Sequence, residues 1–468
     1  MLTNTEHMLD ICNKSVSKAL KQGADEAEAY MVDKEIITVR LARSSIVEAK
    51  AVRDKGLALR IVKDKSIAGS STSMLDDEHI QNAIDNALSN AKVMQRREEW
   101  VSLPHASKII SRVSNCYDKA IINMSVDDVV KLAYIILDAS HEGLLVSGVV
   151  HAVKEHVCIA NSNGISVKDE ATYIVGNVTA DLELDSNSKE YTASRVSGVG
   201  FNASRMLRSF NAESIAREAS SMAIRSRDAR KAEEGVYSII FEPYALGELL
   251  SFVFAYNFNA KAYQDKRSCL YGKIGEKVAV DEFSLLDEPI REDVLGSKPF
   301  DDEGVATYNK HIIERGIFKE LVYDSFYAYK DKVNSTGNAV RSGYPVGRGV
   351  NALPYPSFHN IVVANGDYSM DEMTNDTNHG LIVGRLWYTY PVNPEQGDFS
   401  CTARSGIFEV SNGEIIGARR MVRIVDNLKR LLNSISAIGK DSKQILQWHA
   451  IPCITPPIRV DGVKIVPL

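Results

Sequence analysis

Hydrophobic residues recur at helical spacing near the start of the chain and again before residue 92. The first pattern predicts an amphipathic helix over Thr5–Gln22, ended by Gly23, and the second predicts a helix over Asp77–Lys92. The segments between these helices are short and apolar, as is typical of strands, with a predicted turn at Lys55-Gly56. The predicted strands are Glu28–Val32, Ile36–Leu41, Ile46–Val52 and Leu57–Lys63.

A third helix and a β-rich block follow. Ser125, with Asp128 three residues later, has the spacing of a capping box for a helix that ends near Ser140. Asn163 and Gly164 predict a tight hairpin, because both residue types tolerate positive φ. The other predicted elements here are the strands Val149–Ala160, Ile165–Tyr173, Tyr173–Leu182 and Glu190–Gly200 and the helix Ala212–Arg230.

The stretch Gly235–Tyr263 predicts a strand, a proline and then a long apolar helix. Pro243 suits the first helical turn, and Glu242 suits the helix N-terminus. Short strands dominate the rest of the chain. The elements predicted there are the strand Lys277–Val280, a hairpin within Thr307–Leu321, the strand Asn360–Ala364, a hairpin of Gly406–Val410 with Glu414–Arg420, and the helix Leu428–Ala437.

The charged run Arg225–Glu234 is typical of a solvated helix end, and because the composition changes after it, it also marks a predicted domain boundary. We therefore predict an α+β fold with two domains. Residues 1–230 are expected to form an N-terminal α/β domain of antiparallel strands and flanking helices. Residues 231–468 are expected to form a β-rich C-terminal domain.

Composition narrows the class of protein. The 468 residues are 44% hydrophobic and 25% charged, which is ordinary for a globular chain, and the net charge of −6 argues against a general nucleic-acid binder. The N-terminus lacks the pattern of a signal peptide, and no apolar run is long enough to cross a membrane. We therefore expect a cytoplasmic protein whose six cysteines, none in a CxxC pair, are mostly buried thiols.

Candidate metal ligands are scattered along the chain. His151 and His156 lie in one predicted strand, where residues five apart point to opposite faces, so a shared metal ion is not expected. His449 and Cys453 are both zinc-ligand types, but Pro452 disfavours a regular helix between them, so their spacing of four does not place them on one helical face. The sequence contains no GxSxG elbow, no Walker A motif and no GxGxxG, which argues against these forms of nucleophilic catalysis and phosphate binding.

The acidic cluster Asp301, Asp302 and Glu303 precedes Gly304. Three adjacent carboxylates are able to bind a hard cation. They are more often found in a turn, where their side chains accept hydrogen bonds from backbone amides, and Gly304 favours that interpretation.

This cluster belongs to a longer pattern that resembles the TldD/PmbA family. The pattern runs through SKPFDDEGVAT (297–307), the hairpin IIERGIF (312–318) and the segment STGNAVR (335–341). In that segment the family-motif residues are Ser335, Thr336, Gly337, Asn338 and Arg341. The resemblance covers nearly the whole chain and implies an N-terminal α/β domain, a β-rich C-terminal domain and a peptide chamber between subunits.

The family is similar in fold throughout but has two branches. TldD-type subunits are zinc metalloproteases with an HExxxH motif and a cysteine ligand near the C-terminus, whereas PmbA-type subunits, also called TldE, lack the motif. The two types are understood to assemble into a protease that processes small, flexible peptides. Cys453 lies about where the family cysteine occurs, and both branches can keep that cysteine.

The residues that the resemblance places at the zinc motif are Phe252, Val253 and Asn257. None of them is a zinc ligand of the family, and the chain has no histidine between His156 and His311. We therefore predict a PmbA/TldE-type non-catalytic subunit without a cofactor, whose partner is a TldD-type subunit that carries zinc. The alternatives are an independent metallopeptidase with a relocated zinc site, using Cys453 with His449, His379 or His359, and a peptide-binding homodimer with no enzymatic activity.

Overall fold

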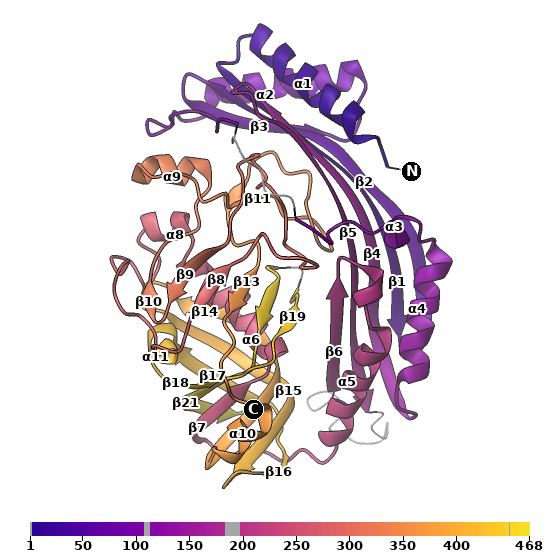
Figure 1. Ribbon diagram of the computed structural model, residues 1–468, viewed down its shortest axis with the longest axis vertical. Coiled ribbons are helices and arrows are strands. Elements are labelled where there is room, and N and C mark those ends of the chain that lie inside the picture. The colour runs from indigo at the N-terminus through magenta and orange to yellow at the C-terminus, as the bar shows by residue number, and fades with distance from the viewer. Residues whose placement is uncertain (1, 107–112, 183–196, 449) are drawn as a thin grey trace.

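The computed structural model describes residues 2–106, 113–182, 197–448 and 450–468. Its N-terminal half is a six-stranded antiparallel sheet whose long strands curve around the C-terminal half (Figure 1). In spatial order the strands are β3 (Ser66–Thr72), β2 (Ser45–Lys63), β1 (Glu26–Ala42), β4 (Leu144–Asn161), β5 (Ser166–Leu182) and β6 (Ser197–Ser204). The predicted strand Glu190–Gly200 lies partly outside the described residues.

Strands β1 and β2 are continuous where the hydrophobic pattern predicted a break. Lys55 and Gly56 pair with Asp33 and Val32 inside the sheet, so the predicted turn is wrong. Gly56 serves a close approach instead, because a Cβ atom there would meet the Val350 side chain at 2.9 Å. The two predicted strands around Tyr173 likewise form the single strand β5. The hairpin at Asn163-Gly164 is confirmed, and Gly164 has φ of +90°.

Four helices cover one face of this sheet. Helix α4 begins with the predicted capping box, in which Ser125 and Asp128 exchange hydrogen bonds. Helix α5 ends at Arg225, the first residue of the charged run, so the prediction that this helix continues to Arg230 is wrong. The helices are α1 (Thr5–Lys21), α2 (Asp77–Val93), α4 (Val126–Ala139) and α5 (Ala212–Arg225), with the short α3 (Lys119–Ile122) and the 3-10 turn η1 (Leu207–Ser209) beside them.

The C-terminal half contains a closed barrel and a second sheet. The barrel runs β14–β7–β21–β17–β15 and closes through the pairing of β14 with β15. Its strands are β7 (Gly235–Phe241), β14 (His379–Asn393), β15 (Asp398–Ser411), β17 (Val422–Asn427) and β21 (Ile458–Pro467), extended by β16 (Glu414–Ala418) and β18 (Ile435–Ile438). The second sheet, in order, is β10 (Ile317–Phe318), β9 (Lys310–Glu314), β8 (Leu285–Asp287), β13 (Ile361–Val363), β20 (Cys453–Thr455) and β19 (Lys443–Ile445).

Short elements complete this half, and two of them correct predictions. The predicted helix Leu428–Ala437 stops at Leu432, and the rest of its apolar residues form β18 against the barrel. The predicted strand Lys277–Val280 makes one isolated bridge, from Lys277 to Ile317. The remaining elements are α8 (Ala260–Gln264), α9 (Ser325–Asp331), α10 (Met370–Asn375), α11 (Leu428–Leu432), β11 (Ala339–Val340) and β12 (Tyr355–Pro356).

The apolar helix after Pro243 lies in the core of the C-terminal half and is interrupted by a π-turn. Its parts are α6 (Pro243–Leu249), the π-helical turn η2 (Leu250–Phe254) and α7 (Ala255–Asn257). Leu246, Leu250 and Phe254 are fully buried in the largest hydrophobic cluster. This burial explains why the stretch is apolar on all sides. The predicted α+β fold is confirmed, and none of the described helices has the length and apolarity needed to span a membrane.

Candidate functional site

The thiol of Cys453 contacts the apolar helix formed by α6, η2 and α7, which we call the central helix. Its Sγ atom lies 3.4 Å from the Ser251 hydroxyl, 3.7 Å from the carbonyl oxygen of Gly247 and 3.3 Å from that of Ile451. The contact arises because β20 begins at Cys453 and packs against α6. Burial raises the pKa of the Cys453 thiol to about 12, with the Ser251 hydrogen bond opposing the shift. The group is therefore a protonated thiol at neutral pH, not a nucleophile.

Glu248 is a buried carboxyl group beside this contact. It is 1% exposed, and the indole nitrogen of Trp448 lies 3.4 Å from its Oε2 atom. Burial raises the pKa of Glu248, and the neighbouring Thr389, Trp448 and Arg385 only partly oppose the shift. In the sequence, Glu248 stands out only as a single carboxylate inside an apolar run. Sequence reasoning assigned it no role.

The residues around Cys453 do not fit a zinc ion. A structural or catalytic zinc site needs three or four imidazole, thiolate or carboxylate ligands, whereas Cys453 is surrounded by a hydroxyl and carbonyl groups. A side chain at Gly247 also has no room, because its Cβ would lie 2.9 Å from Cγ2 of Ile445. Within the described ranges, no group of three or more His, Cys, Asp or Glu side chains is arranged to hold a metal ion.

The predicted motif positions Phe252, Val253 and Asn257 lie on the later turns of the same helix. Val253 is 2% exposed and packs in the core. The Asn257 side chain donates to the carbonyl of Val253 at 2.8 Å and accepts from the amide of Cys269 at 3.0 Å. Asn257 therefore fixes the chain that follows the helix. The observed Cys453 contact lies one turn earlier, at Gly247 and Ser251.

The acidic cluster forms the turn that the sequence favoured. One oxygen of Asp301 accepts hydrogen bonds from the amides of Glu303 and Val305, each at 2.9 Å, and the other accepts from the amide of Ala339 at 3.0 Å. Gly304 has φ of +82°, a backbone conformation that glycine adopts without strain. What the sequence did not reveal is that Asp302 and Glu303 also bind buried cations.

These cations join the two halves of the protein. Arg60 of β2 contacts Glu28 of β1 and Glu303 of the C-terminal half, each at 2.6 Å. Arg341 reaches back to Glu28. Burial of Glu28 opposes its ionisation, but Arg60 and Arg341 hold its pKa below the ordinary value. The other contacts of the network are Arg348 with Asp302 at 2.9 Å and with Asp169 at 2.8 Å, Lys298 with Asp302 at 3.1 Å, and Lys34 with Glu155 at 3.4 Å.

The predicted segment 335–341 is part of the same framework. Asn338 donates to Asp287 at 2.7 Å and accepts from Lys310 at 3.0 Å, and both partners are buried. Thr336 accepts a hydrogen bond from the amide of Tyr323 at 2.7 Å, and Ser335 donates to the carbonyl of that residue at 3.3 Å. The structure thus gives these motif residues positioning roles within the C-terminal half.

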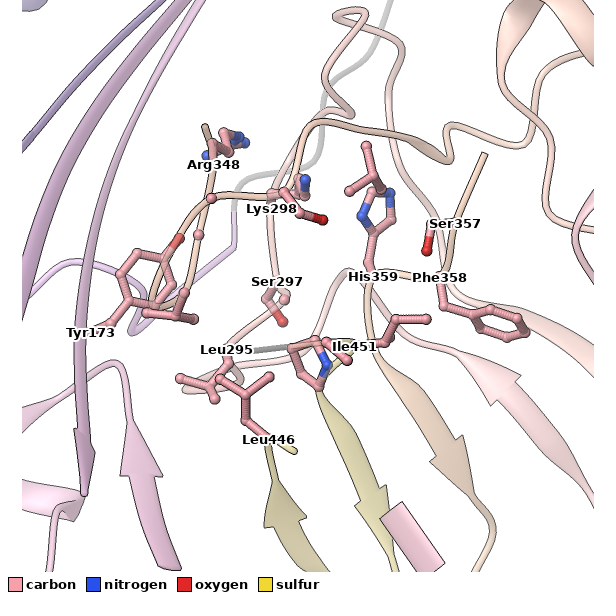
Figure 2. A pocket seen from close by; sticks show the side chains of 18 residues that line it. Tyr173, Leu295, Ser297, Lys298, Arg348, Ser357, Phe358, His359, Leu446 and Ile451 are labelled. Carbon is pink, nitrogen blue, oxygen red and sulfur yellow. The ribbon is translucent and has the colours of Figure 1, made fainter. Parts of the chain in front are cut away.

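A small cavity of about 60 Å³ separates this framework from the Cys453 segment (Figure 2). The ring of His359 lies beside Lys298 in it, with Ile451 nearby. His359 Nε2 lies 2.7 Å from the carbonyl oxygen of Gly337 and therefore acts as the donor. Burial and the charge of Lys298 lower the pKa of His359 to about 3.

The buried His359 predicts a specific pH dependence of stability. The unfolded chain binds a proton at the ordinary pKa near 6.5 and the folded chain does not until about pH 3, so stability falls as pH drops below 6.5. We expect His359→Gln to flatten the plot of unfolding free energy against pH between pH 6 and 4 by up to about 1.4 kcal/mol per unit. Urea unfolding at several pH values measures this slope. An unchanged slope, or the same flattening in a variant of the exposed His7, would contradict the expectation.

A larger cleft, about 730 Å³ in volume, lies between the curved sheet and the C-terminal half. Its walls combine strands β1, β4 and β5 on one side with Tyr244 of α6 and Arg385 of β14 on the other. The segment Leu446–Trp448 also lines it, so the cleft ends beside the indole that contacts Glu248. Clefts of this size hold small molecules or a few peptide residues. Sequence reasoning found none of these lining residues, because they come together only in the fold.

Comparison with known proteins identifies the architecture. The model of the PmbA/TldA metallopeptidase C-terminal domain matches residues 234–467, that of domain 1 matches residues 27–91, and that of the central domain matches residues 119–227. A metalloprotease of Methanocaldococcus jannaschii is 23% identical over 92% of each chain. A PmbA metalloprotease homologue of Buchnera aphidicola is 23% identical over 86% of each chain. The crystal structure of TldE from Thermococcus kodakarensis has a TM-score of 0.85 and 24% identity, covering 97% of this chain and all of that one.

The protein has an α+β fold with a curved N-terminal sheet and a C-terminal barrel, and its candidate site is the buried contact between the central helix and Cys453. The chain belongs to the PmbA/TldA metallopeptidase family. The central-domain model ends at residue 227, and the C-terminal-domain model begins at residue 234.

Proposed function

We propose that this chain is a PmbA/TldE-type non-catalytic subunit, which partners a TldD-type zinc protease and helps to bind small, flexible peptides. The observation that carries the proposal is the contact of Cys453 with the central helix. The helix residues that contact the thiol are Gly247 and Ser251, neither of which supplies an imidazole, and Ile445 fills the space above Gly247. The chain is similar to relatives named for both branches and, in fold, to a TldE structure, so the helix residues and not the names carry the choice of branch.

The HExxxH pattern can be placed on the helix in two registers. The register predicted from sequence begins at Phe252. A second register begins at Gly247, puts the motif glutamate at Glu248 and the second histidine at Phe252, and is supported by the contact of Cys453 with Gly247. Neither register contains an imidazole, so zinc and the activated water are assigned to the partner. Our proposal therefore holds in both registers.

Reconstitution tests the partnership. We expect the chain, mixed with the TldD-type subunit from the same source, to elute as a complex in size-exclusion chromatography and to increase cleavage of short peptides. A Cys453→Ala variant of this chain should leave that cleavage within about twofold, because the thiol supplies no ligand. Absence of a complex, or absence of any gain in cleavage, would refute the proposal. A stable homodimer that excludes the TldD-type subunit would favour the homodimeric peptide binder.

The alternative of a relocated zinc site makes a different prediction. His359 is engaged with Gly337, His379 stacks on the ring of Tyr237 at 4.0 Å between centroids, and His449 lies outside the described residues. Metal analysis of protein purified without chelators separates the two proposals. We expect far less than one zinc ion per chain. Near-stoichiometric zinc that is lost in Cys453→Ala would establish the relocated site.

A further inference from the structure

Two arginines meet at an irregularity in the barrel wall beside the cleft. Arg385 of β14 pairs with Ser405 of β15, and the next pair is Leu386 with Ala403, so Arg404 is an extra residue at a β-bulge. Bulges break the alternation of side chains and commonly turn a residue toward a site. The Arg404 guanidinium lies over the ring of Trp387, 3.8 Å from its centroid. Partial burial and the nearby charge of Arg385 lower the pKa of Arg404.

Among the described residues, neither Arg385 nor Arg404 lies in an ion pair. The Nε atom of Arg385 is buried and has no hydrogen-bond partner among the described residues. The described carboxylates near the two arginines are Asp181 near Arg404, Glu248 near Arg385, and Glu48 across the cleft, which is already paired with Lys50 at 2.8 Å. Two adjacent guanidinium groups without a paired carboxylate are a costly arrangement unless an anion joins them.

We infer that Arg385, which lines the cleft, binds a carboxylate group of a peptide there, and that Arg404, which lies next to it against Trp387, adds to the positive charge that attracts this group. The guanidinium fork matches the geometry of a carboxylate and holds it through two parallel hydrogen bonds. The cleft volume of about 730 Å³ accommodates a few residues, and Tyr244, Tyr344 and Trp448 supply apolar walls for the neighbouring side chains. The inference rests on the proposed role in peptide binding and adds the chemical class of the group that is recognised.

The carboxylate has two possible sources, the C-terminus of the peptide and an acidic side chain. Titration calorimetry of the full-length chain distinguishes them with four probes of one length. The first pair is Ala-Tyr-Ala-Gly-Ala with a free or an amidated C-terminus. The second pair is the amidated peptide with Glu or Gln in the fourth position. We expect one carboxylate probe to bind at least about tenfold more tightly than its neutral counterpart.

Substitutions assign the preference to the arginines. Arg385→Gln/Arg404→Gln should remove the preference for the carboxylate probe, and Arg385→Lys/Arg404→Lys should retain part of it, because lysine keeps the charge but loses the fork. Arg217→Gln removes a charge from the exposed ion pair with Glu213 and should leave the preference unchanged. Thermal unfolding checks that each variant is folded. Equal binding of charged and neutral probes, or a preference that persists in the glutamine variant, would overturn the inference.

The partnership and the carboxylate site fail in different ways. Peptide binding is measured on this chain alone, whereas partnership is measured by complex formation with the TldD-type subunit. A missing complex with an intact carboxylate preference would refute the proposed function and support the site. A complex that forms and cleaves peptides without any arginine-dependent preference would support the proposed function and refute the carboxylate site.

Discussion

Arg60→Met is expected to lower the free energy of unfolding by about 3–5 kcal/mol, the largest stability effect we predict for a single substitution. Arg60 is 4% exposed and neutralises two carboxylates, Glu28 and Glu303, which are both fully buried. The substitution removes the cation, which leaves the buried Glu303 without its arginine and Glu28 with Arg341 alone. A buried unpaired charge is more costly than the loss of the contact itself, because the desolvation of the carboxylate is no longer offset.

Urea unfolding with matched variants measures this effect. Lys63→Met on the same strand removes a cation from the exposed pair with Asp25 and should change stability little, since exposed ion pairs are screened by water. The combined variant Arg60→Met/Glu303→Leu replaces the cation and the carboxylate that loses its partner with apolar side chains, keeps Glu28 paired with Arg341, and should regain much of the loss. A loss below about 1 kcal/mol in Arg60→Met, or no recovery in the combined variant, would contradict our account of the network.

Sequence patterns predict contacts between residues that are close in the chain, and they do not predict the buried ion pairs between distant residues. The helix cap at Ser125 and the hairpin at Asn163-Gly164 depend on residues within a few positions of each other, and both were predicted correctly. Arg60 and Glu303 are 243 positions apart, and nothing near Arg60 in the chain indicates its partner. Local chemistry therefore predicted the acidic turn but not the arginines that bind it.

Local sequence also led to the breaks that were wrongly predicted within strands β1 and β2, because it does not show tertiary contacts. Lys55-Gly56 has the composition of a turn, and only the tertiary contact of Gly56 with Val350 shows why a glycine belongs in mid-strand. The π-turn in the central helix also depends on packing, because its residues are apolar on every side and carry no local signal. The bulge that brings Arg385 and Arg404 together arises from the pairing of two strands, which the sequence of either strand does not specify.

For the candidate site, the sequence shows that the helix after Pro243 has no histidines. It does not show which helix residues occupy the positions of the family's zinc motif. The apolar helix and Cys453 were both identified from sequence, and the structure brings them into contact. Glu248 was visible as the one carboxylate of the apolar run, and its significance depends on that contact. Ile445, which fills the space above Gly247, comes from a strand almost 200 positions later and was not predictable.

The two registers of the zinc motif lead to opposite results when histidines are introduced. We expect Gly247→His/Phe252→His/Ile445→Ala to bind about one zinc ion per chain, because it adds two imidazoles to Cys453 and Glu248 and removes the side chain that fills the space. The π-turn supports this register, since a wider turn brings residues five apart closer to one side of the helix than a regular α-helix does.

The register that begins at Phe252 serves as the matched comparison. Phe252→His/Val253→Glu/Asn257→His should bind little zinc and should also destabilise the fold, because Asn257 fixes the chain at Cys269 and Val253 packs in the core. Metal content after dialysis against zinc measures both variants, and adding Cys453→Ala should abolish binding in the first. Stoichiometric zinc in the second variant but not in the first would place the lost motif at Phe252 instead. That outcome would leave the contact between Cys453 and Gly247 as a packing feature of the helix. If the first variant binds zinc only when it includes Ile445→Ala, the metal site is absent for two reasons. The chain lacks the histidine ligands, and the Ile445 side chain occupies the space of one of them.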